Sequence, residues 1–195
     1  MSASWGYASD DARLAVRSKA LVFGVVLFLG SELMLFAAWF AAYYDLRGVN
    51  TVWPPPDVHL DPLEPSIGTV LLAMSSGFFF PAVRAIRDGR PNAARAWLSG
   101  GLFGAVAFVA LTLHGWSKAA FRWYSHAYGS VYFGMLGLHA AHVAVGVILM
   151  LYLVFGASKA GFRGAHAAGT EAISYYWHFV FIVWLGIWST IFFVR

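Results

Sequence analysis

The sequence predicts an all-α membrane protein, a single domain over residues 1–195 built as a polytopic bundle of five transmembrane helices. The chain has 195 residues, of which 60% are hydrophobic and only 11% are charged, and its mean hydropathy is +0.67. This is more apolar surface than one soluble core of this size could bury. In addition, five separate segments stay apolar over about 20 residues, which is the length that an α-helix needs to cross a bilayer.

The first expected span covers residues 19–44. It follows an N-terminal tail, residues 1–18, whose first 12 residues lack the basic start of a secretory signal. The apolar run is also too long to be the core of a cleaved signal, so we expect this span to be retained. The link after it, residues 45–65, contains the run "WPPP", and prolines keep such a link out of helix.

The second and third spans are expected at 66–87 and 94–114, joined by the tight turn "DGRPN" with its glycine and proline breakers. Pro81 lies near the end of the second span and predicts a kink there. The fourth and fifth spans are expected at 128–156 and 172–194. Both are long enough and apolar enough to cross the membrane.

Basic residues are divided unevenly between the two sides of the membrane. Nine of the 13 Lys and Arg residues fall on the side of the N-terminus, and four fall on the other. The positive-inside rule therefore predicts a cytoplasmic N-terminus and, with five spans, a C-terminus outside. The basic residues lie between apolar segments and not along one stripe, which excludes a nucleic-acid partner. Because the chain has no Cys, disulfides and thiolate metal sites are excluded as well.

Glu32 lies in the middle of the first expected span, within "FLGSELMLFAAWF". An ionised carboxylate without a partner is costly at this depth, so the side chain must be protonated, paired or turned toward a polar cavity. Two interpretations remain open. Glu32 exchanges protons or contacts a lipid headgroup, or it is a neutral side chain that forms a hydrogen bond to a neighbouring helix.

Three histidines fall in the last two spans. His139 and His142 lie three residues apart, on one face of the fourth span, and His178 lies in the fifth. Two histidines at this spacing cannot take opposite faces of one haem, and a metal triad would need His178 to converge with them. We expect no catalytic residue and no metal or cofactor site in this chain. The imidazoles are instead expected to form hydrogen bonds across helices, with Glu32 as a candidate partner; a haem or metal site is the alternative.

The remaining polar and small residues inside the spans and links are given structural roles. Hydroxyls of the second span can bond to carbonyls of their own helix, so no chemistry is assigned to Thr69, Ser75 and Ser76. The link after the third span holds residues expected to be solvated, with lipid-phosphate contact as the functional alternative, namely His114, Lys118, Arg122 and His126. Small residues predict faces where helices approach closely, namely Gly100, Gly101, Gly104, Gly134, Gly137, Ala141 and Gly146.

Four motifs, in order and in register, resemble cytochrome c oxidase subunit III. They are "GSELMLFAAWFAAYY", "WPPPDVHLDPLEPSIGTVLLAMSSG", "GLHAAHVAVG" and "YYWHFVFIVW", and the resemblance, to the shorter bacterial form with five spans, covers roughly residues 20–195. In this comparison Glu32 matches the buried glutamate of the family. The paired histidines of the family correspond to His139 and His142, and the histidine of its "WHF" motif to His178. The loop signature of the family corresponds to Trp53, Pro54 and Pro55.

The resemblance implies a function without chemistry in this chain. Haem and copper belong to the catalytic partner subunits I and II, and this subunit packs directly against subunit I, stabilises it and supports proton uptake. A V-shaped helix arrangement that holds phospholipids is implied, in the cytoplasmic membrane of a bacterium. The complex would pump protons in aerobic respiration, passing electrons from cytochrome c to oxygen. A larger respiratory supercomplex is a further partner that the resemblance allows.

One departure from the family pattern and two other functions need to be considered. The family commonly has Asp in the pattern W-H-F-V-D, where this chain has Phe181, so any mechanism that needs that carboxylate is in doubt. Quinol oxidases and accessory proteins of nitric oxide reductases carry related third subunits, which leaves the electron donor open. A stand-alone proton channel or transporter built around Glu32 is a different class, but no inverted repeat or broken helix supports it.

Overall fold

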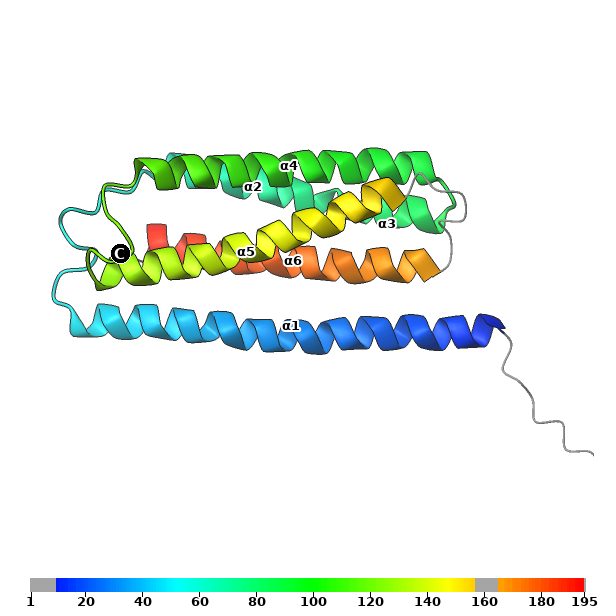
Figure 1. Ribbon diagram of the computed structural model, residues 1–195, viewed down its shortest axis with the longest axis horizontal. Helices are drawn as coiled ribbons and strands as arrows, with labels where there is room; N and C mark the ends of the chain where they lie inside the picture. The colour runs from blue at the N-terminus through cyan, green and yellow to red at the C-terminus, as the bar shows by residue number, and fades with distance from the viewer. Residues whose placement is uncertain (1–9, 157–164, 195) are drawn as a thin grey trace, which may run out of the picture.

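The computed structural model describes residues 10–156 and 165–194, and this part of the chain is entirely helical apart from its links (Figure 1). Its elements, in chain order, are α1 (Asp10–Val49), α2 (Leu63–Gly77), α3 (Phe79–Arg87), α4 (Pro91–Lys118), α5 (Ala127–Gly156) and α6 (Ala165–Phe192). Five stretches are long and apolar enough to cross a membrane, namely Lys19–Val49, Leu63–Arg87, Pro91–Lys118, Ala127–Gly156 and Ala168–Phe192. The prediction of an all-α protein with five spans is therefore confirmed.

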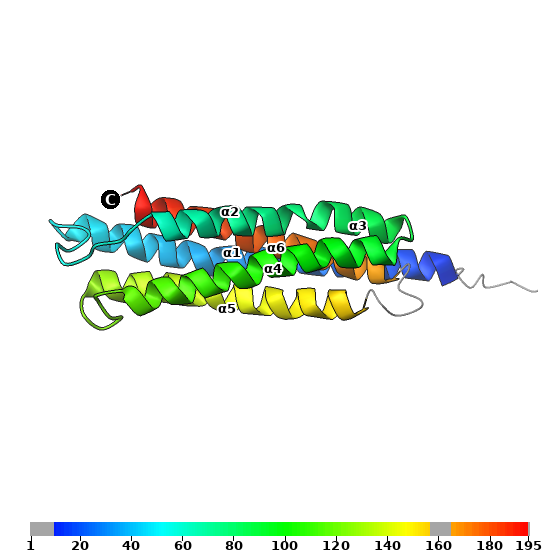
Figure 2. The same ribbon diagram turned by 90° about the horizontal axis from the view of Figure 1, so that it is seen from above.

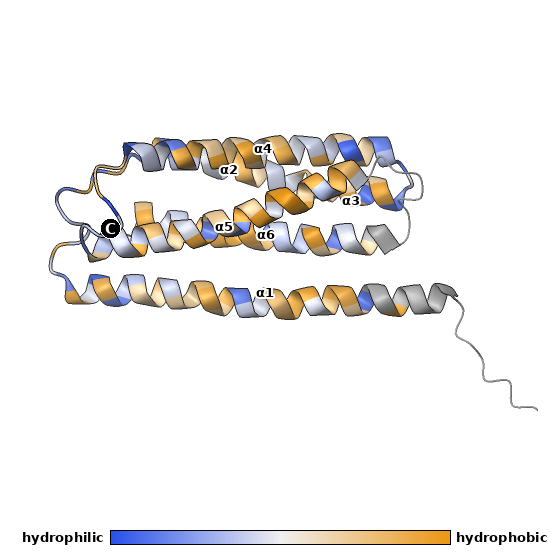
Figure 3. Ribbon diagram, viewed as in Figure 1, coloured by the Kyte–Doolittle hydropathy of each residue, from blue (hydrophilic) through white to orange (hydrophobic). Residues whose placement is uncertain are grey.

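The helices run nearly parallel to one another and are apolar along most of their length (Figure 3). α1 begins at one end of the bundle and α6 finishes at the other, as five spans require (Figure 1). The links 50–62 and 119–126 lie at the same end as the end of α6, and we call this the loop end. Three of the basic residues counted for the positive-inside rule lie outside the described residues, namely Lys159, Arg163 and Arg195.

The first helix is longer than expected at both ends. α1 has 40 residues, and at about 1.5 Å per residue it is roughly 60 Å long, twice the thickness of the hydrocarbon core. Residues 10–18, expected as part of a tail, continue the helix. α4 likewise runs on to Lys118, so the expected third link is shortened to residues 119–126.

The second span consists of two helices, α2 and α3, separated at Phe78. Pro81 has no N–H to offer the carbonyl of Gly77, so one intrahelical hydrogen bond is missing at this point. The backbone stays close to helical, because the Phe78 N–H still donates to the Met74 carbonyl at 3.0 Å. The interruption therefore lies just upstream of the proline at which the kink was expected.

α6 is the central helix of the bundle and contacts α1, α2, α3 and α5 (Figure 2). α4 packs against α2, α3 and α5. α1 lies on one flank, where its contacts among the described helices are with α5 and α6 alone. Of its described side chains only Phe36 and Tyr43 are buried, so most of α1 is left for lipid or another chain to cover.

Glycines bring helices close together at several of the predicted packing faces. A Cβ atom added to Gly104 of α4 would lie 3.0 Å from the Leu71 carbonyl oxygen of α2, and one added to Gly146 of α5 would lie 2.3 Å from the Trp177 ring of α6. The prediction is wrong for Gly137, which has nothing within 4 Å, and for Ala141, which is exposed. Sequence spacing identifies a small residue but does not say which face of the helix meets a neighbour.

Candidate functional site

Glu32 of α1 contacts His142 of α5, with 2.9 Å between Glu32 Oε2 and His142 Nε2. The side chains are 17% and 13% exposed. The Nδ1 atom of His142 lies 2.8 Å from the Leu138 carbonyl oxygen of its own helix. A carbonyl can only accept, so Nδ1 carries the hydrogen and Nε2 faces the carboxyl group.

The Glu32–His142 contact is a hydrogen bond in which either group can be the donor. Either a protonated Glu32 donates to a neutral imidazole, or an imidazolium donates to a carboxylate, and both states have no net charge. The aromatic ring of Phe36, one turn after Glu32, lies 5.0 Å from the His142 ring. The Tyr176 hydroxyl donates to the His142 carbonyl at 2.9 Å. These contacts fix α5 against α1 and α6 at the pair.

His139 does not join this pair, although it is only one turn away. Its Nε2 lies 3.2 Å from the Val180 carbonyl of α6, and its ring contacts Phe108 and Trp184. The expectation that both histidines share one face is wrong in this respect, because a spacing of three residues rotates the side chain by about 60° around the helix. That rotation is enough to place one histidine against α1 and the other against α6.

His178 lies between two serine hydroxyls, on the side of α6 that faces α2. Its Nδ1 is bonded to Ser76 Oγ, and its Nε2 lies 3.1 Å from Ser174 Oγ. The ring of Phe80 stacks on it, with 4.9 Å between centroids. Both ring nitrogens are thus engaged by α2 and α6. In residues 10–156 and 165–194 no three His, Asp or Glu side chains are grouped so that they could hold a metal ion.

The two serines of α2 make contacts between helices that the sequence interpretation missed. Ser75 Oγ donates to the Gly101 carbonyl of α4 at 2.6 Å and accepts from Trp177 Nε1 at 3.1 Å. Ser75 and Ser76 therefore connect helices and do not bond back to their own. Only Thr69 behaves as expected, because its hydroxyl donates to the Pro65 carbonyl at 2.9 Å. The glycine at 101 was the available signal, since it allows α4 to approach the serine.

The proline-rich loop closes the loop end of the bundle over aromatic side chains. The ring of Trp53 lies 5.5 Å from that of Tyr43 and 5.0 Å from that of Tyr128. The peptide bond between Trp53 and Pro54 is cis, and the Pro55 carbonyl accepts from the Val58 N–H at 3.0 Å. The loop signature therefore packs against both α1 and α5.

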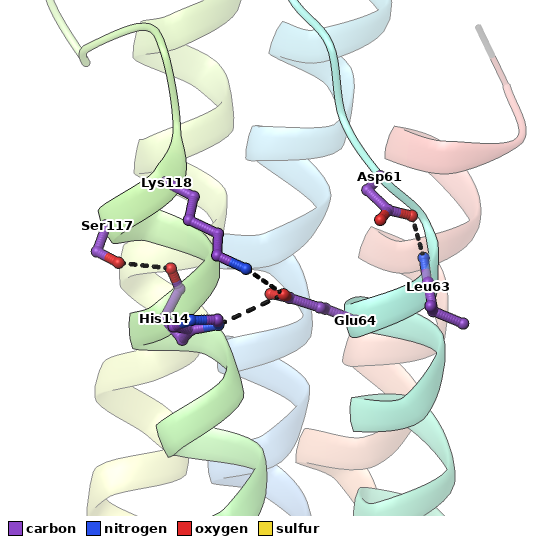
Figure 4. Close-up of polar contacts among 6 residues, drawn as sticks. All are labelled: Asp61, Leu63, Glu64, His114, Ser117 and Lys118. Carbon is purple, nitrogen blue, oxygen red and sulfur yellow. Dashed lines mark hydrogen bonds and ion pairs between the residues drawn. The ribbon is translucent and has the colours of Figure 1, made fainter.

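At the same end an ion cluster joins α2 to α4 (Figure 4). Lys118 Nζ lies 2.8 Å from Glu64 Oε1, and His114 Nδ1 lies 3.4 Å from the same oxygen. Both basic residues belong to α4 and not to the expected link; they are exposed, as expected of solvated side chains, and they also pair with Glu64. His126 Nε2 lies 3.6 Å from Asp57 Oδ2. Arg122 remains in the link and is exposed.

A family model for cytochrome c oxidase subunit III matches residues 6–195. The chain belongs to the cytochrome c oxidase subunit III family. The resemblance identified from the four motifs is confirmed, and with it the assignment of this chain as a subunit of a cytochrome c oxidase complex.

Some relatives of this subunit III are bacterial proteins of similar length, and others are longer proteins of which this chain covers about 70%. A probable cytochrome c oxidase subunit 3 of Nocardia farcinica is 36% identical over 181 residues, which cover 88% of this chain and 87% of that protein. Cytochrome c oxidase subunit 3 of Corynebacterium diphtheriae is 34% identical over 183 residues, with coverage of 88% and 87%. The protein of the same name from Tragelaphus oryx is 32% identical over 184 residues, covering 91% of this chain and 70% of that protein.

Phe181 stands where the resemblance to the family led us to expect a carboxylate. The side chain is partly buried and packs against the hydrophobic core. The last span of this subunit III therefore has an apolar contact at that position. The acid that the structure places inside the helix bundle at mid-span is Glu32, within the part of the chain that it describes.

Proposed function

We propose that this subunit III is a non-catalytic part of a proton-pumping haem–copper oxidase, in which cytochrome c supplies electrons for the reduction of oxygen. It packs directly against subunit I and stabilises it, while subunits I and II hold the haem and copper. It lies in the cytoplasmic membrane of a bacterium, with its N-terminus in the cytoplasm and its C-terminus outside. Family membership and the bacterial relatives support this proposal.

The Glu32–His142 pair is the observation that carries the proposed role in proton uptake. Glu32 Oε2 and His142 Nε2 lie 2.9 Å apart, so a proton accepted by one side can be passed to the other and released without leaving net charge in the membrane. Each side chain keeps a small exposed fraction, 17% and 13%. The pair is therefore reachable from the surface between α1 and α5, where subunit I or lipid would lie.

Phospholipid is the second proposed contact of this subunit. α1 exposes a set of large apolar side chains between residues 16 and 35, which a bilayer or a partner subunit must cover. These are Val16, Leu21, Phe23, Val26, Leu27, Phe28, Leu33, Met34 and Leu35. The V-shaped cleft implied by the family would hold lipid against this flank. In a larger respiratory supercomplex, a neighbouring protein could cover part of the same surface.

Replacement of Glu32 tests the role of the pair. Glu32→Gln keeps a donor for His142 Nε2 but cannot exchange a proton, so we expect an assembled complex with oxygen reduction largely intact. Ser31→Ala, at the next residue of α1, is the matched control, because its hydroxyl only bonds the Phe28 carbonyl of its own helix. Oxygen uptake and protons translocated per electron are measured in reconstituted vesicles.

The two measurements separate the two parts of the proposal. Complete loss of oxygen reduction in a fully assembled Glu32→Gln complex contradicts a non-catalytic role for this subunit. A lower proton-to-electron ratio is expected if the pair supports proton uptake. An unchanged ratio rejects that role and leaves the pair as a structural hydrogen bond.

The partner subunits identify the electron donor. A neighbouring subunit with a dinuclear copper centre supports cytochrome c as the donor. A complex without that centre favours a quinol oxidase, to which a related third subunit could also belong. Isolation of the chain by itself, with proton conductance in vesicles, would instead support a stand-alone channel.

A further inference from the structure

Two adjoining cavities lie between α4 and its neighbours, on the opposite side of α5 from Glu32. The first, which we call the chamber, lies near the loop end between α2, α4, α5 and α6 and has a volume of about 180 Å³. The second, which we call the groove, lies between α4 and α5 and has a volume of about 310 Å³. The side chains that line both are Phe108, Thr112, Leu136 and Trp184.

The groove is apolar and open to the outside of the bundle. Val106, Leu113 and Ile148 line it and are exposed. Its one titratable side chain among the lining residues, His139, is bonded through Nε2 to the Val180 carbonyl. An empty cavity of about 150 Å³ with apolar walls is already large enough to bind benzene. A hydrocarbon group from the membrane therefore fits the groove in both size and polarity.

The chamber adds polar groups at its outer mouth. Lys118 and Glu64 line it and form the ion pair at 2.8 Å, with His114 directed at the same carboxylate (Figure 4). An ammonium has three donors, of which Glu64 uses one. This mouth carries charges of both signs, Lys118 with Glu64 and Asp61, and lies directly above apolar walls, as in a site that holds the zwitterionic head and the chain of one amphiphile.

A buried donor in the chamber wall points to an oxygen-bearing ligand. The Nε1–H of Trp116 is buried and has no hydrogen-bond partner within the described part of the chain, and this side chain lines the chamber. The other indole of the chamber wall, Trp184, is satisfied, because its Nε1 donates to Thr69 Oγ1 at 2.8 Å. A donor left unpaired in an apolar setting is costly, and an ester or phosphate oxygen in the mouth would accept from it.

We propose that the groove and the chamber form one binding site for a membrane phospholipid from the leaflet at the loop end. One acyl chain lies in the groove, and the ester or phosphate oxygens meet Trp116 Nε1 and Lys118. From Val106 to Lys118 the site follows α4 for about 18 Å at 1.5 Å per residue, slightly more than half of the roughly 30 Å hydrocarbon core. This site is distinct from the α1 flank and does not depend on the role of the subunit in proton uptake.

A photoreactive phospholipid tests the site in the intact complex. Phosphatidylethanolamine with a diazirine in the middle of one acyl chain is added to the complex in lipid nanodiscs and irradiated, and labelled residues are mapped by peptide mass spectrometry. We expect labels on α4 within 106–113 and on α5 within 143–148. Labels spread evenly over all exposed apolar positions would overturn the proposal.

A pair of neighbouring variants separates this site from general lipid contact. Ala144 lines the groove, whereas Val145, also exposed, does not. Ala144→Phe fills the groove and is expected to lower labelling about tenfold, as the loss of a few buried methylenes implies. Val145→Phe adds the same ring outside the groove and is expected to leave labelling unchanged. Equal labelling in the two variants contradicts an occupied groove.

The head of the ligand is tested separately. Trp116→Phe keeps the ring but removes the N–H, and loss of one hydrogen bond is expected to lower labelling about fivefold. Unchanged labelling in Trp116→Phe contradicts the proposed head position. An excess of unlabelled free fatty acid should not compete; displacement of the probe by it at equal concentration would show that a fatty acid, and not a phospholipid, occupies the site.

Discussion

Replacement of Gly146 by alanine should loosen the contact between α5 and α6. The new Cβ would lie 2.3 Å from Cζ3 and 2.4 Å from Cε3 of Trp177. The indole cannot move aside easily, because it is 1% exposed and its Nε1 is bonded to Ser75 Oγ at 3.1 Å. Forcing an extra methyl group into so tight a contact costs about 1–3 kcal/mol.

Gly137 of the same helix provides the matched control. A Cβ there has nothing within 4 Å, so Gly137→Ala should only gain the helix preference of alanine, about 1 kcal/mol. The same gain applies at Gly146, so the difference between the two variants isolates the contact with Trp177. For a chain of this size, 1 kcal/mol corresponds to about 2–4 °C in the unfolding midpoint, and we expect Gly146→Ala to unfold several degrees below Gly137→Ala.

The assay is thermal unfolding of the purified complex in mild detergent, followed by the fluorescence of its tryptophans. A second variant, Trp177→Leu, removes the ring; in that background Gly146→Ala should cost little, because the clash is gone. Equal midpoints for Gly146→Ala and Gly137→Ala would refute the contact between Gly146 and Trp177. An undiminished cost in the Trp177→Leu background would refute it as well.

Three further changes test other contacts. Ser75→Ala leaves Trp177 Nε1 without an acceptor and should destabilise the complex by about 1–3 kcal/mol, whereas Ser31→Ala at an exposed site should change the unfolding midpoint much less. Gly134→Ala would bring a Cβ to 2.3 Å from the Trp39 ring, so the contact between α1 and α5 should weaken. Limited proteolysis should then cut α1 faster than in the unchanged protein; an unchanged rate of cleavage would contradict the packing. Glu64→Gln removes an exposed ion pair and should leave the midpoint unchanged at high salt; a large loss there would contradict its exposed position.

The sequence predicted the spans well because hydropathy directly reports which segments can face lipid. It predicted the break in the second span less well. Pro81 indicated a kink, but the helix divides at Phe78, since a proline removes the hydrogen bond to the carbonyl four residues earlier. The length of α1 was also missed, because residues 10–18 are too polar to count as membrane-spanning although they continue the helix.

For the Glu32–His142 site, the sequence predicted that a buried polar side chain needs a partner, but not which residue that partner is. An acid at the depth of Glu32 requires a donor or an acceptor, and His142 supplies it. The choice between His139 and His142 depends on how α5 is rotated between α1 and α6, which a sequence does not state. The cross-helix role of Ser75 depends in the same way on the approach of Gly101, a tertiary contact between segments 26 residues apart.

The most direct test of the account is to identify the chains that accompany this protein when it is extracted from its native membrane with a mild detergent. We predict a stable complex containing a large haem- and copper-bearing subunit, with all of the haem absorbance assigned to that subunit after separation. A chain that migrates without such a partner, or that keeps a haem Soret band when isolated, would contradict the account.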